Sequence, residues 1–200
     1  MLIQRSEQKT RSRVFSSEAK LSGTKFQISY FTDGSASPNP GPGGFAVIKN
    51  GQPYIIGSEP ENSAVSRNLT TNIRMEGFAI LVALNDFLEE NFAKNQKKNP
   101  ASRENKLCEL TTDSEFWLNV LTKWAPVWSR NGWRKKGGAI KNLELVREIY
   151  ELYSHHSEQI KLTWTRGHVG TELNELANIW ANRARELKIS GTQKIAALNL

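Results

Sequence analysis

The sequence predicts an α/β protein with a five-stranded mixed sheet, in which three antiparallel strands precede parallel crossovers and helices flank the sheet. Three short apolar runs come first, and Asn50-Gly51 between the second and third is a strong hairpin signal. Two further strand patterns follow, each preceded by apolar residues at helical spacing. Such order requires crossover connections, so the first, fourth and fifth strands are expected to be parallel neighbours.

Each expected element rests on a local pattern of apolar and turn residues. The strands are expected where short apolar runs end in turn residues, at 25–32, 45–48, 53–57, 107–111 and 160–165. Helices are expected where apolar residues recur every three or four positions, at 72–87, from Phe116 to a break or kink at Pro126, at 141–156 and from Asn174 onward. Residues 89–105 are rich in Lys, Asn and Gln and are expected to form a polar loop.

The domain organisation follows from composition. Residues 1–23 combine basic and small polar side chains with few apolar ones, which predicts a flexible basic tail. Residues 24–188 hold the patterned segments and are expected to form one domain. Residues 189–200 have no clear assignment and are treated as a C-terminal tail.

The net charge and the cysteine content indicate which kind of partner and which cellular compartment to expect. The net charge of +7 over 200 residues favours a polyanionic partner, of which nucleic acid is the usual one. Cys108 is the single cysteine, so a disulfide framework is excluded and a reducing compartment is favoured. No apolar run is long enough to cross a bilayer. We therefore expect a cytoplasmic protein without a membrane partner. We also expect a monomer, because no heptad or exposed apolar stripe in the sequence suggests self-association.

Three carboxylates are expected to meet at one edge of the sheet. Asp33 and Asp113 each follow an expected strand, and the two strands are predicted to be parallel neighbours. Glu76 lies in the first turns of an expected helix, from which it can reach the same edge. Like charges this close are costly unless a cation neutralises them, and oxygen ligands without thiolate select Mg²⁺ or Mn²⁺. Two such ions would support phosphodiester hydrolysis.

Four motifs resemble those of the type 1 ribonuclease H family, in its bacterial form with a basic protrusion. They are Thr32-Asp33-Gly34-Ser35 with the glycine-rich turn to Gly44, then 71–76, 112–114 and 164–168 with Asn174-Glu175. The likeness covers residues 25–187. It implies a ribonuclease H-like fold, cleavage of the RNA strand of RNA/DNA hybrids, and two Mg²⁺ ions per site, with Mn²⁺ as a substitute.

The resemblance also assigns site residues. Those implied to be catalytic are Asp33, Glu76, Asp113, His168 and Asn178, and all of these except His168 are implied metal ligands. His168 resembles a loop histidine that assists proton transfer or product release, a role that suits an imidazole titrating near neutral pH.

Asn178 departs from the family pattern, in which this position is usually Asp. An amide keeps a carbonyl oxygen as a ligand but loses the negative charge. Three interpretations remain open: a natural active variant, an engineered Asp→Asn substitution, or a degenerate site that only binds hybrids. Glu175, one helical turn earlier, could compensate. The alternatives to a nuclease of this family are thus a hybrid-binding protein with impaired or no catalysis, and an integrase- or transposase-like nuclease.

Substrate-binding residues are also implied by the resemblance. Asn39 and Asn72 resemble contacts to the hybrid's minor groove, while Ile73 stands where many relatives have a second amide. Thr71 and Arg74 are expected to contact DNA-strand phosphates. The segment 124–136 resembles the basic protrusion, with Trp124 anchoring it and Trp133 more exposed. Its expected substrate contacts are Trp128, Trp133, Arg134, Lys135 and Lys136.

Overall fold

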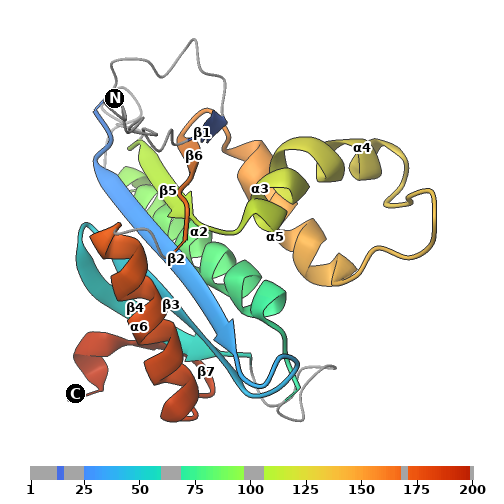
Figure 1. Ribbon diagram of the computed structural model, residues 1–200. Helices are drawn as coiled ribbons and strands as arrows, with labels where there is room; N and C mark the ends of the chain where they lie inside the picture. Colours follow the sequence, from blue (N-terminus) through green and yellow to red (C-terminus); the bar gives the residue numbers. More distant parts are fainter. Residues whose placement is uncertain (1–12, 16–24, 60–68, 97–105, 168–170, 199–200) are drawn as a thin grey trace, which may run out of the picture.

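The computed structural model describes residues 13–15, 25–59, 69–96, 106–167 and 171–198. Its strands form one seven-stranded sheet with the order β1-β6-β5-β2-β3-β4-β7 (Figure 1). The strands are β1 (Arg13–Phe15), β2 (Ile28–Ala36), β3 (Gly43–Lys49), β4 (Gln52–Ser58), β5 (Cys108–Thr112), β6 (Ile160–Trp164) and β7 (Gly191–Lys194). The helices are α2 (Asn72–Gln96), α3 (Glu115–Asn119), η2 (Val120–Trp124), α4 (Ala125–Arg130), α5 (Leu143–His155), α6 (Glu172–Glu186) and η3 (Ile195–Ala197).

The predicted fold class is confirmed, and the strand count is corrected from five to seven. The five expected strands form the continuous centre of the sheet, β6-β5-β2-β3-β4. β1 lies within the segment expected to be a flexible tail and pairs with β6, while β7 lies within the expected C-terminal tail and pairs with β4. β1 and β7 form because β6 and β4 would otherwise have an unpaired edge. The sequences of β1 and β7 contain no strand pattern from which this pairing could be predicted.

The central strands pair in the directions that the sequence predicted from its crossover connections. β2, β3 and β4 are sequential antiparallel neighbours, and Asn50 and Gly51 turn between β3 and β4 with φ of 50° and 80°. β5 pairs in parallel with both β2 and β6. The carboxyl ends of these three strands therefore lie at one edge of the sheet.

Each face of the sheet is covered by its own helices. On β3 and β4, Val47 and Ile55 join the larger core, which α2 and α5 complete. Their neighbours Ala46 and Ile56 point to the opposite face and pack against α6. α6 thus covers one face together with the chain around η3, and α2 and the α3–α5 block cover the other (Figure 1). No helix in the described ranges is long and apolar enough to cross a membrane.

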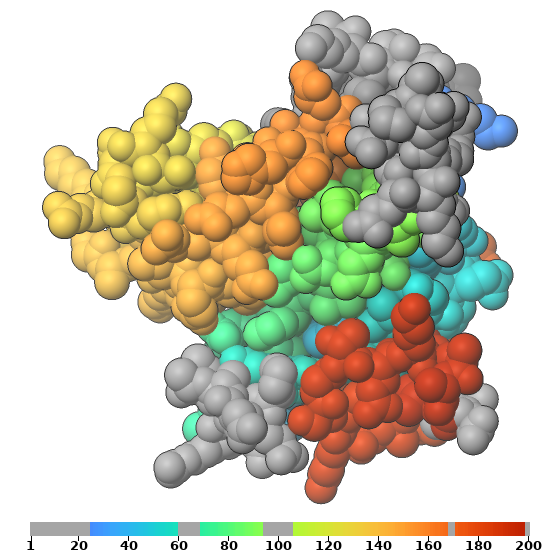
Figure 2. All heavy atoms as spheres, turned by 180° about the vertical axis from the view of Figure 1, so that it is seen from behind, coloured from blue at the N-terminus to red at the C-terminus, as the bar shows by residue number. Residues whose placement is uncertain are grey.

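The α3–α5 block stands beside the body. The helix expected to break or kink at Pro126 does not break there; it continues from α3 through the π-turn η2, directly before the proline, into α4. Pro126 lacks an N–H, and the Ala125 N–H before it bonds to the carbonyl of Val120, which widens that turn. The fully buried Trp117 joins the block to α2 by donating its indole N–H to the Ile73 carbonyl over 2.7 Å. From behind, residues 115–155 project from the flank of α2 (Figure 2).

α2 is longer than predicted. It runs to Gln96, so the first part of the expected loop at 89–105 is helical, and residues 97–105 lie outside the described chain. Its last turns are fixed by polar contacts to the body: Glu90 pairs with Lys49 and Lys106. Asn91 accepts a hydrogen bond from the Lys106 N–H over 3.2 Å.

Candidate active site

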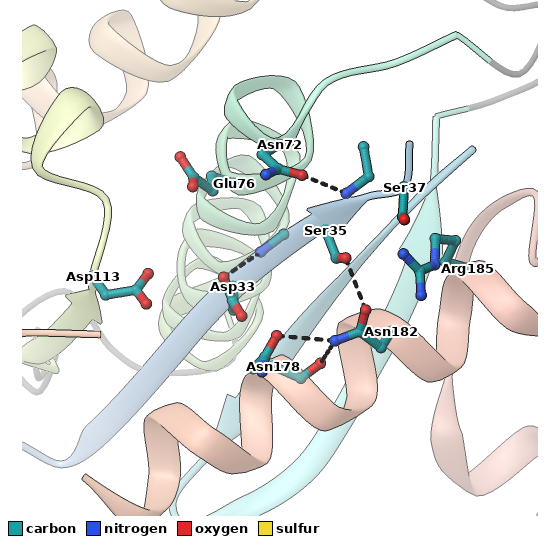
Figure 3. Close-up of a pocket in the computed structure, with 11 residues that line it drawn as sticks. Asp33, Ser35, Ser37, Asn72, Glu76, Asp113, Asn178, Asn182 and Arg185 are labelled. Atoms are coloured by element: carbon teal, nitrogen blue, oxygen red, sulfur yellow. Dashed lines mark hydrogen bonds between the residues drawn. The ribbon is translucent and has the colours of Figure 1, made fainter. Parts of the chain in front are cut away.

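An open groove of about 430 Å³ lies between the carboxyl end of β2 and the helices α2 and α6 (Figure 3). Three expected metal ligands, Asp33, Glu76 and Asp113, line it from three different elements, and Asn178 lines it from a fourth. The remaining lining residues are Gly34, Ser35, Ala36, Ser37, Asn72, Asn182 and Arg185. The structure therefore brings together four of the five residues expected to be catalytic. The fifth, His168, lies outside the described residues.

The strand register places Asp33 beside Asp113. The parallel pairing of β2 with β5 ends at Thr32 opposite Thr112, and an aspartate follows each of these threonines. Asp33 was expected at the end of its strand, but it lies within β2, which continues to Ala36 along β3. It is at the end of the parallel pairing, where β5 leaves the sheet and the groove opens.

Gly34 brings Glu76 to the two aspartates. A Cβ at Gly34 would overlap the backbone nitrogen of Glu76 and the carbonyl carbon of Met75. Only glycine lets the first turns of α2 pack this closely against β2. The Glu76 carboxylate then accepts a hydrogen bond from the Ser114 hydroxyl over 2.5 Å, and Ser114 also caps α3.

Asp113 is held by neighbours on two sides. Its carboxylate accepts a hydrogen bond from the Asn174 amide over 3.0 Å, and its carbonyl accepts one from the Trp164 indole over 3.0 Å. A Cβ at Gly167 would lie 2.7 Å from the Asp113 carboxylate, so the segment that leads to His168 passes directly by this acid.

The electrostatics of the groove penalise ionised carboxylates. Asp33 is 8% exposed, and burial together with the charges of Asp113 and Glu76 raises its pKa to about 8, although the Gly34 N–H stabilises the carboxylate. Burial, and then the charge of Asp113, also raise the pKa of Glu76 against the hydrogen bond from Ser114. Within the described chain, none of the three acids forms an ion pair with a basic side chain. The groove has the character of a cation site.

The Asp33→Asn variant should be more stable than the unmodified protein when metal is chelated. Asp33 has a pKa near 3.8 in the unfolded chain and about 8 in the folded one, so ionisation destabilises the fold as pH rises between these values. We expect the gain to be negligible near pH 4 and at least ~1 kcal/mol at pH 8. Urea unfolding in EDTA across this range measures it. A gain that is independent of pH would contradict the assigned cause.

The carboxylate and amide oxygens in the groove are suitable ligands for a divalent cation, but they do not surround one completely. Carboxylate and amide oxygens are the ligands that Mg²⁺ and Mn²⁺ prefer. In the part of the chain that the structure describes, no three His, Cys, Asp or Glu side chains are grouped tightly enough to hold a metal ion by themselves. Mg²⁺ usually keeps several waters and substrate oxygens in its shell, so an open set of protein ligands suits it.

The amide of Asn178 is oriented by its neighbours. The Asn182 amide nitrogen donates to the Asn178 carbonyl over 2.9 Å and to its side-chain Oδ1 over 3.0 Å. The backbone carbonyl can only accept, which fixes the Asn182 amide with its nitrogen toward Asn178. Its oxygen accepts a hydrogen bond from the Ser35 hydroxyl over 2.9 Å (Figure 3). Glu175, a possible substitute ligand, is exposed and does not line the groove.

The expected minor-groove residues lie at the start of α2. The Asn72 amide oxygen accepts a hydrogen bond from the Ala36 N–H over 2.6 Å, so its NH₂ group remains available to a ligand. Asn39 is exposed, and its amide oxygen accepts from the Asn72 N–H over 3.3 Å. The Thr71 hydroxyl caps α2 by accepting from the Arg74 N–H over 3.2 Å. Ile73 is exposed beside them.

Arg74 is not placed as expected. Its side chain is buried, with the residue 5% exposed, and its guanidinium donates to both oxygens of Glu59 over 3.2 and 2.7 Å and to Glu144 over 2.6 Å. Asn142 accepts a further hydrogen bond over 3.0 Å. A guanidinium engaged in this way joins α2 to the start of α5 and has little capacity left for a DNA phosphate.

The expected order of exposure of two protrusion tryptophans is reversed, although Trp124 still packs edge-on against Phe116. Trp124 is 39% exposed, whereas Trp133 is half-buried, with its ring edge-on to Tyr150 and under the Arg147 guanidinium. Trp128 is half-buried beside Trp124. The exposed cations expected to meet phosphates are Arg134, Lys135 and Lys136.

Four groove residues with polar side chains escaped the sequence reasoning, namely Ser35, Ser37, Asn182 and Arg185. The available signal was the spacing of Asn174, Asn178 and Asn182, which recur every four residues on one side of α6. Three amides in such a row suggest a polar face turned toward a site. Arg185 is seven residues after Asn178 and belongs to the same side.

The seven-stranded sheet and its acid-lined groove define an α/β protein of the ribonuclease H-like fold. The family model for RNase H matches residues 25–186. The ribonuclease H of Gluconobacter oxydans (strain 621H) is 33% identical over 172 residues, which are 84% of this chain and 98% of that protein. The chain therefore belongs to the ribonuclease H family.

Solved structures agree with this assignment. LC9-RNase H1, described as a type 1 RNase H with the type 2 active-site motif, has a TM-score of 0.53 and 26% identity, covering 84% of this chain and 76% of that one. LC11-RNase H1 in complex with RNA/DNA hybrid has a TM-score of 0.50 and 21% identity, covering 81% of this chain and 99% of that one. The second likeness shows the fold alone.

Proposed function

We propose that this protein is an endoribonuclease that hydrolyses the RNA strand of RNA/DNA hybrids. The observation that carries the proposal is the parallel register of Thr32 with Thr112, which brings Asp33 and Asp113 together in one groove. Family membership supports the substrate class. A cytoplasmic monomer remains the prediction from the sequence.

Divalent cations are proposed as cofactors, two Mg²⁺ per site with Mn²⁺ as a substitute. Asp33, Glu76, Asp113 and the Asn178 amide oxygen would hold them, since all four line the groove. When bound, such ions supply an activated water and stabilise the leaving oxygen of the phosphodiester. The raised pKa of Asp33 supports the proposal, because burial and then the charge of Asp113 raise it, and a bound cation would stabilise the ionised carboxylate against both.

The chain's own residues orient the acids and the substrate. The Ser114 hydroxyl fixes the Glu76 carboxylate, and Asn174 fixes that of Asp113. Asn72 offers an NH₂ donor to 2′-hydroxyl oxygens or base edges, which distinguish RNA from DNA in the minor groove. His168 is proposed to carry a proton to or from the reacting oxygen, and the adjacent Gly167 lies against Asp113.

A second candidate function is hybrid binding without catalysis. The observation that favours it is Asn178, which lines the groove with a neutral amide where relatives usually have Asp. One negative charge fewer weakens the hold on a cation. The two candidates differ in one measurable result, because a binder gives no product with any metal.

The Asn178→Asp variant should cleave faster than the unmodified chain. A carboxylate adds charge to the donor set and still accepts the hydrogen bond from Asn182 that orients the side chain. We expect kcat/KM to rise about tenfold or more, equivalent to ~1.4 kcal/mol of transition-state stabilisation. End-labelled RNA/DNA hybrid is incubated with each protein in Mg²⁺ and in Mn²⁺, and the RNA products are resolved.

The same assay separates the two candidate functions. Internal RNA cuts by the unmodified chain support the nuclease. Binding of the hybrid with cuts only after Asn178→Asp would establish a hybrid-binding protein with a disabled site. Equal rates for the two proteins would show that the amide at 178 does not limit the reaction.

A further inference from the structure

Among the residues that the structure describes, Arg185 is the single cation that lines the groove, and it lies at the end opposite Asp113. The lining residues run along β2 from Asp33 to Ser37 and along α6 from Asn178 to Arg185. The Arg185 side chain extends from α6 into the groove beside Ser37, and the acids lie farther along the same groove (Figure 3). The groove therefore has an acidic end and a basic end, both open to one ligand.

The position of Arg185 is set by helix geometry and close packing. Asn178, Asn182 and Arg185 are four and then three residues apart, so they share one side of α6. Gly44 lets this turn of α6 approach β3, because a Cβ there would lie 2.5 Å from the Arg185 backbone nitrogen. The base of the side chain is thus held at the groove, and the residue is half-buried.

The guanidinium has no carboxylate partner in the described ranges. Every ion pair found there involves other cations, including Arg183 with Glu186 on the same helix. No side-chain hydrogen bond from Arg185 is formed in those ranges either. Because arginine presents a planar fork of N–H donors, a half-buried and unpaired one is suited to a phosphate, which it can bind with two parallel hydrogen bonds.

We propose that Arg185, with the hydroxyl of Ser37, forms a subsite for a backbone phosphate of the RNA strand near the scissile one. The proposal rests on the proposed function, because it takes the strand at the acidic end to be the RNA that is cut. Seven residues of α6 span about 10 Å. At about 3.4 Å of rise per nucleotide, the bound phosphate lies within about three nucleotides of the cut.

The subsite sets where the RNA strand lies in the groove. The acids repel a phosphodiester until a cation is present, whereas Arg185 attracts the same strand with or without metal. It would therefore contribute to binding in EDTA as well as to cleavage. That difference gives a readout that is independent of catalysis.

The test compares Arg185→Gln with Arg183→Gln in the full-length chain. Both variants remove one positive charge from α6, but Arg183 is exposed and points away from the groove side of the helix. For Arg185→Gln we expect about tenfold weaker hybrid binding in EDTA and a salt slope, d log K/d log[salt], smaller in magnitude by about 0.7 to 1. Arg183→Gln should stay within about twofold of the unmodified protein.

A hybrid with single neutral methylphosphonates locates the contact. Substitution at one phosphate near the cut should weaken binding by the unmodified chain and leave binding by Arg185→Gln unchanged. Equal effects of the two arginine variants, or no position at which the methylphosphonate effect depends on Arg185, would overturn the subsite. Binding without cleavage by the unmodified chain would refute the proposed nuclease, but the effects of the two arginine variants on hybrid binding would still test the subsite. No hybrid binding at all would overturn both.

Discussion

Replacement of Asp113 by asparagine is expected to lower the rate of hybrid cleavage by about 10³-fold or more, equivalent to ~4 kcal/mol. The change removes one of the two aspartates that the β2/β5 register brings together, while an amide oxygen can still accept the hydrogen bond from Asn174. Hybrid binding in EDTA should be unchanged or tighter, because a negative charge beside the phosphate backbone is lost. Single-turnover cleavage in Mg²⁺ and fluorescence anisotropy in EDTA measure the two effects.

Glu115→Gln is the matched control for Asp113→Asn. Glu115 is two residues away in the first turn of α3, is exposed and does not line the groove. Loss of its charge should change cleavage by less than about twofold. The assignment of Asp113 fails if its asparagine variant cuts within tenfold of the unmodified chain, or if the control loses as much.

The Gly34→Ala variant should lose both stability and cleavage. The added methyl group would overlap the backbone of Met75 and Glu76, and backbone atoms cannot move aside as a flexible side chain can. We expect the free energy of unfolding to fall by about 3 kcal/mol or more. Because α2 must shift from β2, Glu76 moves away from Asp33 and cleavage should fall at least about 100-fold. Urea unfolding and the hybrid assay report the two losses.

Gly51→Ala is the control for Gly34→Ala. It shows how much stability is lost when a glycine is replaced at a site without close packing. Gly51 has a φ of 80° in the β3–β4 turn, and an added Cβ would meet nothing within 4 Å. Its replacement should cost about 1 kcal/mol and leave cleavage intact at a temperature where the protein is folded. If Gly34→Ala were no more harmful than Gly51→Ala, the packing of α2 on β2 would not be what positions Glu76.

The centre of the fold and the acidic part of the groove were predictable because local patterns determine them. Alternating apolar residues and the Asn50-Gly51 turn specify the hairpin, and crossover connections make β2 and β5 parallel. Once those strands are neighbours, Asp33 and Asp113 must emerge together. Their catalytic roles remain proposals that the variants above test.

Other features depend on tertiary partners that leave no pattern in the sequence. Arg74 looked like a surface cation, but Glu59 after β4 and Glu144 at the start of α5 converge on it. Trp124 and Trp133 could not be ranked by exposure, because the segment between α3 and α5 has no regular apolar period and its packing on Tyr150 is decided by the fold.

The short outer strands of the sheet affect how this protein can meet other proteins. β1 has three residues and β7 has four, the latter mostly exposed and polar. They cover the longer strands β6 and β4, whose unpaired N–H and C=O groups would otherwise offer a template to a foreign strand. Recruitment by strand addition is thereby disfavoured at both margins, which favours partners that recognise side chains on helices or turns.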